Sequence, residues 1–185
     1  MAPHAWTRRS LLKASLAGLL VLLGKTTSPA EMIPVRLPEG RLVLYNLHTD
    51  ERATVTYRSP SGEYDRQALH DLNHILRCHY SNQMATMDLR VIEYLNAVDK
   101  RLGGNNEIHI VSGYRSPEYN DLLIRQGKAV AKNSLHVLGQ AVDIQMPGVD
   151  LTLVRQAALS LEYGGVGYYP ASGFLHLDSG RFRWW

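Results

Sequence analysis

The fold is decided by SLHVLGQAVD at residues 134–143 and by FLHLD at residues 174–178. In the first stretch, Gly139 permits a tight turn before an apolar run begins, which predicts a loop that leads into a strand. In the second stretch the side chains alternate, so His176 and Asp178 share one face of a strand while the two leucines face the core. We therefore expect two strands that carry polar side chains on a defined face.

Strand and helix signals alternate irregularly along the rest of the chain. Short runs rich in β-branched and aromatic residues predict strands, and apolar residues at three- and four-residue spacing predict helices. We expect strands at residues 42–47, 53–58, 108–111, 141–146 and 164–169, with 174–178 as the last strand. Helices are expected near residues 69–76, 89–98, 117–126 and 151–161. This order is typical of an α+β fold, because a doubly wound sheet would alternate regularly.

Three side chains in the two deciding stretches have the chemistry of metal ligands, namely His136, Asp143 and His176. Imidazole and carboxylate groups bind Zn²⁺ at about 2.0–2.2 Å. Three protein ligands with a fourth position left to water are typical of a catalytic zinc rather than a structural one. From the residues alone, a zinc site and a pair of structural histidines both remain open.

Two further residues are candidates for catalysis. Asp178 lies about 6.5–7 Å along the strand from His176 and on the same face. It is either the general base that takes a proton from zinc-bound water, the role that we put forward, or a partner that orients a ligand histidine. Arg115, in an SGYRSP turn, is expected to bind a substrate carboxylate or to stabilise an oxyanion, with a plain surface arginine as the alternative. Ser134 is a candidate to hold the backbone or ring of His136, or a simple turn residue.

Residues 1–30 have the features of an export signal. TRRSLLK at residues 7–13 is a twin-arginine motif, and the apolar run that follows is too short to span a bilayer. Small residues precede Glu31, where cleavage is expected, although a buried helix with a basic start is the alternative. We expect a leader at residues 1–30, a lead-in linker at residues 31–41 and one domain at residues 42–185, exported by the twin-arginine route to the periplasm and without a stable membrane span after cleavage.

The leader also accounts for the basic charge. The whole chain has 20 basic and 17 acidic residues, a formal charge of +3. Four of the basic residues lie in the leader, which leaves 16 against 17, or −1, for the rest. Nucleic acid is therefore not an expected partner. The one cysteine, Cys78, excludes an intramolecular disulfide and is expected to be a small buried residue, with a nucleophile paired with His79 as the alternative. We expect a monomer.

Several ordered segments resemble the YcbK-like murein endopeptidases. These are VSGYRSP at residues 111–117, the stretch at residues 134–143, AALS at 157–160 with GGVGYYP at 164–170, and FLHLDSG at 174–180. RCHYSN at residues 77–82 also resembles the first helical region of this group. The group belongs to the metallopeptidases that include the zinc D-Ala-D-Ala carboxypeptidases, lysostaphin and the hedgehog signalling domain. The similarity covers nearly the whole chain from Leu42 onward.

The resemblance implies a small antiparallel sheet with helices packed on one side, as in hedgehog and D-Ala-D-Ala peptidase folds. It implies that His136, Asp143 and His176 bind zinc. It also implies that the substrate is peptidoglycan, cut in the cross-links between stem peptides during cell wall remodelling. The carboxypeptidases carry an acid or histidine three residues before the last ligand, where this chain has Gly173. The base must therefore come from elsewhere, and Asp178 is the candidate that the sequence offers.

The sequence leaves three points open. A D-Ala-D-Ala-type carboxypeptidase and a non-catalytic zinc-containing peptidoglycan-binding module remain as alternatives to the endopeptidase. The cross-link can be of the D,D or the L,D type. Tyr114, Tyr168 and Trp184 are candidates to line a substrate groove, with core packing as the alternative.

Overall fold

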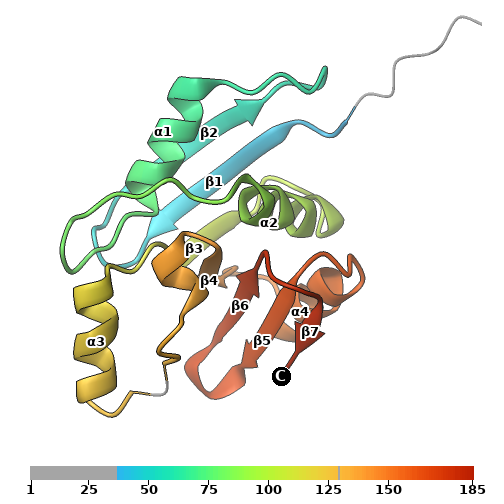
Figure 1. Cartoon of the computed structure of the whole chain (residues 1–185). Coiled ribbons are helices and arrows are strands. Elements are labelled where there is room, and N and C mark those ends of the chain that lie inside the picture. Colours follow the sequence, from blue (N-terminus) through green and yellow to red (C-terminus); the bar gives the residue numbers. More distant parts are fainter. Residues whose placement is uncertain (1–36, 129) are drawn as a thin grey trace, which may run out of the picture. The chain divides into compact units, whose positions relative to one another are not determined.

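The computed structural model describes residues 37–128 and 130–185, which form a mixed sheet with helices (Figure 1). The strands are β1 (Gly40–Asn46), β2 (Arg52–Arg58), β3 (Glu107–Ser112), β4 (Ala141–Gln145), β5 (Gly165–Tyr169), β6 (Phe174–Asp178) and β7 (Arg183–Trp184). The helices are α1 (Arg66–Ile75), α2 (Leu89–Arg101), α3 (Pro117–Arg125) and α4 (Leu151–Leu159), with 3-10 turns η1 (Leu135–Leu138) and η2 (Pro170–Ser172). Among these helices none is long and apolar enough to cross a membrane.

The strands follow the order β2-β1-β3-β4-β6-β5-β7 across the sheet. Four neighbouring pairs are antiparallel, but β1 pairs with β3, and β5 with β7, in parallel. The α+β class is confirmed, and the sheet is mixed rather than purely antiparallel. The long connection through α1 and α2 lets β3 run parallel to β1, as parallel pairs require a crossover.

The end of the strand series and the start of β1 differ from those expected. β6 is not the last strand, because β7 follows it and pairs with β5 through Gly165 and Arg183. A strand of two residues is too short to show an alternating pattern, so the sequence gives no signal for it. β1 begins at Gly40, which pairs with Arg58, and so starts within the stretch that we expected to be a linker. The expected leader at residues 1–30 lies outside the described residues.

One face of the sheet packs on the helices. α1 contacts β2, α2 contacts β1 and β6, and α4 contacts β5, β6 and α2. α3 gives no residue to this core, so the expected packing of helices on one side holds for α1, α2 and α4. The buried side chains of this face include Leu42, Leu44, Ile108, Ile110, Val142, Ile144, Leu175 and Leu177 from strands, Leu72 from α1, Val91 and Leu95 from α2, and Val154 from α4.

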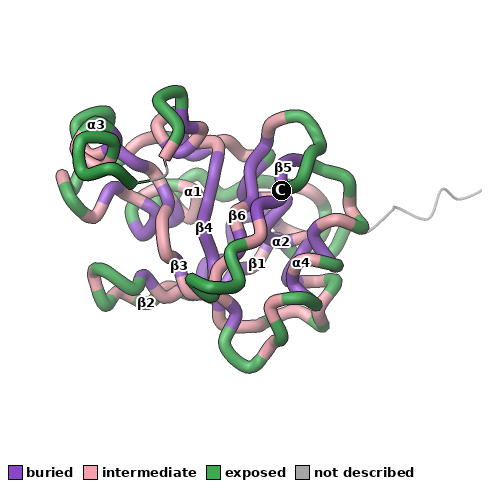
Figure 2. Tube along the Cα trace, turned by 90° about the horizontal axis from the view of Figure 1, so that it is seen from below, coloured by how far each residue is buried: buried purple, intermediate pink, exposed green. Residues whose placement is uncertain are grey.

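The opposite face of β4 and β6 carries the polar side chains. Because side chains alternate, the inward direction of Val142 and Leu175 turns Asp143 and His176 to the other face. The two strands are neighbours, and their register pairs Asp143 directly with His176. Figure 2 shows that β4 is nevertheless buried along most of its length. The centre of the sheet therefore presents a buried polar site on the side away from these three helices.

Candidate metal centre

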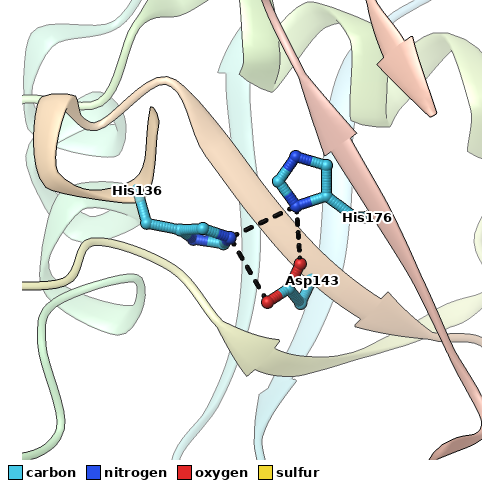
Figure 3. Close-up of side chains that lie close together, drawn as sticks. All are labelled: His136, Asp143 and His176. Atoms are coloured by element: carbon cyan, nitrogen blue, oxygen red, sulfur yellow. Dashed lines mark hydrogen bonds and ion pairs between the residues drawn. The ribbon is translucent and has the colours of Figure 1, made fainter. Parts of the chain in front are cut away.

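Three side chains from η1, β4 and β6 converge on this face (Figure 3). His136 Nε2 lies 3.3 Å from Asp143 Oδ2 and 3.3 Å from His176 Nδ1, and His176 Nδ1 lies 2.8 Å from Asp143 Oδ1. All three ligand atoms lie within 4.8 Å of one another. No other group of His, Cys, Asp and Glu in the described part of the chain meets in this way. The residues that the sequence predicts as ligands therefore form a possible metal site.

The turn η1 presents His136 toward β4. Ser134 caps this turn, since its Oγ accepts a hydrogen bond of 3.3 Å from the His136 backbone N–H. Gly139 follows with a φ of 66°, a left-handed conformation that glycine adopts at little cost. The chain then enters β4, which carries Asp143. The loop that we expected before the strand is therefore present, and it has the form of a single 3-10 turn.

In each imidazole, the nitrogen that does not face Asp143, here called the outer nitrogen, lies beside a hydrogen-bond acceptor. His136 Nδ1 lies 2.8 Å from the Gly113 carbonyl oxygen, and His176 Nε2 lies 3.0 Å from Asp178 Oδ2. A carbonyl and a carboxylate only accept, so these hydrogen bonds assign a proton to the outer nitrogen of each ring. The inner nitrogens can then direct their lone pairs toward Asp143. This is the tautomer that metal ligation requires.

The charges of the site favour a bound cation. Burial opposes ionisation of Asp143, but the charge of His136 and hydrogen bonds from both histidines hold its pKa well below the usual range. Burial also opposes protonation of His176, yet hydrogen bonds to Asp143 and Asp178 outweigh it and raise its pKa to about 9. The cluster therefore stabilises a positive charge at its centre, which either a proton or a metal ion supplies.

The carboxylate of Asp178 is fully buried and surrounded by donors. Besides the His176 ring, it accepts two hydrogen bonds from the guanidinium of Arg183, at 2.9 and 2.8 Å. The backbone amides of Gly180 and Gly165 donate to Oδ1 at 2.8 and 3.2 Å. Burial works to raise the pKa of Asp178, but these donors lower it below its ordinary value. The carboxylate of Asp178 is therefore placed to orient the His176 ring and has few lone pairs left to accept a proton.

Arg115 is buried beside the possible metal site and is not a surface arginine. Its Nη1 donates to Asn120 Oδ1 at 3.2 Å, and its Nη2 lies 4.0 Å from Asp143 Oδ2. Its backbone N–H also donates to the carbonyl oxygen of His136 at 3.1 Å. Burial lowers the pKa of Arg115, whereas the nearby Asp143 raises it. Arg115 thus lies where a cation can contact a group bound at the site.

A cleft of about 280 Å³ opens onto the three converging side chains. Arg115 and Arg183 contribute positive charge to its lining. The aromatic part of the lining contains Tyr169 and Phe174, whose rings stack with centroids 4.6 Å apart, and Trp185, whose Nε1 donates to the Tyr169 hydroxyl at 2.8 Å. The cleft therefore combines cations with flat apolar surfaces.

The aromatic residues of the cleft are not those that we expected. Tyr114 and Tyr168 pack against the hydrophobic core, and Trp184 is exposed outside the cleft lining. Their places are taken in part by Tyr169 and Trp185, each one residue further along the chain. The expectation was wrong because successive side chains of a strand point to opposite faces, and the sequence does not show which face of β5 and β7 borders the cleft.

Comparison with known proteins identifies the family of this chain. A family model described as peptidoglycan L,D-endopeptidase MepK matches residues 37–185. The chain belongs to this MepK family. The peptidoglycan L,D-endopeptidase MepK of Escherichia coli (strain K12) is 37% identical over 179 residues, which cover 96% of each chain. The probable peptidoglycan L,D-endopeptidase MepK of Haemophilus influenzae is 36% identical over 174 residues, 92% of each chain.

The match confirms the resemblance to the murein endopeptidases and places this chain in a family of peptidases. The similarity to both relatives extends over almost the full length of this chain and of each relative. Sequence reasoning nevertheless missed three features of the site, which are Arg183, Trp185 and the carbonyl of Gly113. The only signal for the first two was a short tail rich in arginine and tryptophan after FLHLDSG, and a backbone carbonyl leaves no signal in a sequence.

Proposed function

We propose that this chain is a zinc-dependent murein endopeptidase that hydrolyses amide bonds in the peptide cross-links of peptidoglycan. The observation that carries the proposal is the convergence of two imidazoles, each with its outer nitrogen held, on the carboxylate of Asp143. The MepK relatives are named as L,D-endopeptidases, which favours cross-links of the L,D type.

The donor set fits zinc. In a tetrahedral site with bonds of about 2.0–2.1 Å, two ligand atoms lie about 3.3 Å apart. His136 Nε2 lies at this distance both from Asp143 Oδ2 and from His176 Nδ1. His136, Asp143 and His176 would hold the ion, and the two nitrogens and one carboxylate match the ligands of catalytic rather than structural zinc. When bound, the metal supplies a Lewis acid that polarises the scissile carbonyl and acidifies a water molecule.

The other residues bind, orient and hold charge. Asp178 fixes the ring of His176 through Nε2, and Gly113 fixes that of His136 through Nδ1. Arg115 provides a positive charge beside Asp143 for a substrate carboxylate or for the negative charge that develops on the scissile carbonyl oxygen. We propose a catalytic role for Arg115. We assign Asp178 to positioning, because the oxygens of its carboxylate already accept hydrogen bonds from several donors and are shielded from solvent.

We also propose that the protein acts in the periplasm as a monomer, after export by the twin-arginine route. The basis is the TRRSLLK motif and the site of the proposed substrate, which lies outside the cytoplasmic membrane. Replacement of Arg8 and Arg9 by lysine, followed by cell fractionation, tests the export route. Retention of the precursor in the cytoplasm is expected, and unchanged export would contradict it.

Digestion of purified muropeptides separates this function from its two rivals. An endopeptidase converts a cross-linked dimer into monomers, and a carboxypeptidase instead shortens a monomeric pentapeptide by one residue. A non-catalytic binding module leaves both intact. Product masses therefore decide among the three.

A further inference from the structure

Arg183 connects the edge strand β7 to the interior of the site. Its guanidinium faces the Asp178 carboxylate in a bidentate arrangement, with Nη1 2.9 Å from Oδ1 and Nη2 2.8 Å from Oδ2. The Arg183 side chain is 45% exposed, whereas the Asp178 side chain is fully buried. A buried carboxylate needs a charged partner with good geometry, because an unpaired buried charge is strongly unfavourable. In the described residues no other Lys or Arg pairs with Asp178.

The same carboxylate also orients a ligand. Asp178 Oδ2 accepts from Arg183 Nη2 and from His176 Nε2, so one oxygen links the guanidinium to the imidazole. In the observed orientation of the His176 ring, Nδ1 faces Asp143 at 2.8 Å while Nε2 faces this oxygen at 3.0 Å. A rotation of the carboxylate would therefore disturb the nitrogen that faces the metal site.

The surrounding backbone leaves room for this ion pair. A Cβ atom at Gly165 would overlap both Asp178 Oδ2 and Arg183 Nη1. A Cβ atom at Gly180 would lie 2.8 Å from Asp178 Oδ1 and 3.0 Å from Arg183 Nη1. Trp185 fixes the strand that carries the arginine, since its N–H donates to Val166 and its carbonyl accepts from Tyr168. The pair is thus enclosed by glycines on one side and held by strand pairing on the other.

We propose that Arg183 is a positioning residue for the metal-binding ring of His176 and acts through Asp178. The inference rests on the metal site of the proposed function. The planar fork of arginine fixes both carboxylate oxygens at once, which lysine cannot do with its single ammonium group. Loss of such an outer contact typically weakens metal binding by about 10–100-fold.

The test measures the zinc dissociation constant by competition with a chelator. Arg183→Gln should weaken zinc binding by about 10–100-fold, and Arg183→Lys should give an intermediate value because it restores the charge but not the fork. Arg181→Gln is the matched control, because Arg181 is exposed in the bend just before β7 and its side chain has no partner in the described structure. The control should bind zinc like the parent protein.

Two further readouts separate positioning from a general structural role. With Co²⁺ in place of zinc, the visible spectrum should change in Arg183→Gln and not in Arg181→Gln, because it reports ligand geometry. In an Asp178→Asn background, Arg183→Gln should cause little additional loss of zinc affinity, since the arginine acts through that carboxylate. If Arg183→Gln does not fold, Arg183→Lys carries the comparison.

The inference is overturned if the folded Arg183 variants bind zinc within twofold of the parent, even if their melting temperature falls. It is also overturned if the fold-losses of zinc affinity caused by Asp178→Asn and by Arg183→Gln multiply fully in the double variant. A parent protein that binds no zinc would overturn the metal site and this inference together. A parent that binds zinc but leaves muropeptides uncut, with Arg183 behaving as expected, would overturn the enzymatic function and support the role of Arg183.

Discussion

At the scale of single residues, the direction of each imidazole nitrogen defines the site. The sequence predicts that His136 and His176 are the relevant histidines, because each shares a short motif with an acid. It does not predict that His136 turns Nε2 and His176 turns Nδ1 toward Asp143, since this depends on acceptors from other parts of the fold. Gly113 and Asp178 provide those acceptors and so determine which lone pairs meet.

Replacement of a ligand should remove the metal. We expect His136→Ala to lose bound zinc and all peptidase activity, because two ligands remain where three are needed. Metal content after dialysis, with activity measured in parallel, tests this. His70→Ala is the control, since His70 is exposed on α1 away from the three ligands. A His136→Ala protein that kept one zinc per chain would exclude this residue as a ligand.

The two roles of Asp178 predict different results at saturating zinc. If Asp178 orients His176, Asp178→Asn should weaken zinc affinity, and added zinc should restore much of the activity. If Asp178 is the base, the variant should bind zinc normally and stay inactive at every zinc concentration. We expect the first result, and activity titrated against free zinc distinguishes the two.

At the scale of elements, the pairing of β4 with β6 builds the site. Alternation along each strand predicts the face of Asp143 and of His176 separately. It does not predict that these strands are neighbours, because the pairing joins residues more than thirty positions apart and depends on the whole sheet. The strand β7, with two residues, was missed for the different reason that it is too short to carry a pattern.

Asp88 ties the stretches at residues 134–143 and 174–180 to α2. Its carboxylate caps the helix through the Arg90 N–H at 2.9 Å and accepts from the Ser179 hydroxyl at 2.6 Å, and its backbone N–H donates to the Gly139 carbonyl at 2.8 Å. Asp88→Ala removes the cap and the bond to Ser179, so it should lower the free energy of unfolding by about 1.5–3 kcal/mol.

Asp150→Ala is the matched control for this prediction. Asp150 caps α4 through Thr152 alone, so its loss should cost only about 1 kcal/mol. Chemical denaturation of both variants measures the difference. Equal losses would mean that the bond between Asp88 and Ser179 contributes nothing to stability.

At the scale of the whole molecule, the sequence predicts the α+β class and most elements, because local periodicity determines them. The mixed character of the sheet was not predictable, since parallel pairing of β1 with β3 depends on how the crossover packs. The aromatic lining was misassigned for a similar reason. Tyr168 and Tyr169 are the same residue type and adjacent in the chain, so only the packed sheet shows that Tyr169 borders the cleft.

The global stability should depend on pH through His79. Burial, together with the charges of His48 and Arg115, lowers the pKa of His79 from 6.5 to about 4. The unfolded chain therefore binds a proton that the folded chain does not between these values, and stability falls as pH drops from about 6.5 to about 4.

Substitution of His79 isolates this contribution. In His79→Phe the aromatic packing on His48 and Tyr119 is largely kept and the titrating group is gone. The melting temperature should therefore fall less between pH 7 and pH 4 than in the parent. The exposed His70→Phe serves as the control and should follow the parent profile. Identical profiles for His79→Phe and the parent would contradict the assignment.

We propose that the three converging side chains hold zinc and that the protein thereby hydrolyses peptide cross-links. The most direct measurement is digestion of purified L,D-cross-linked muropeptide dimers by the zinc-loaded protein, with products identified by mass. We predict conversion to monomers, which stops when a chelator removes the metal and returns when zinc is added. A protein that carries one zinc per chain and leaves the dimers intact would contradict this function.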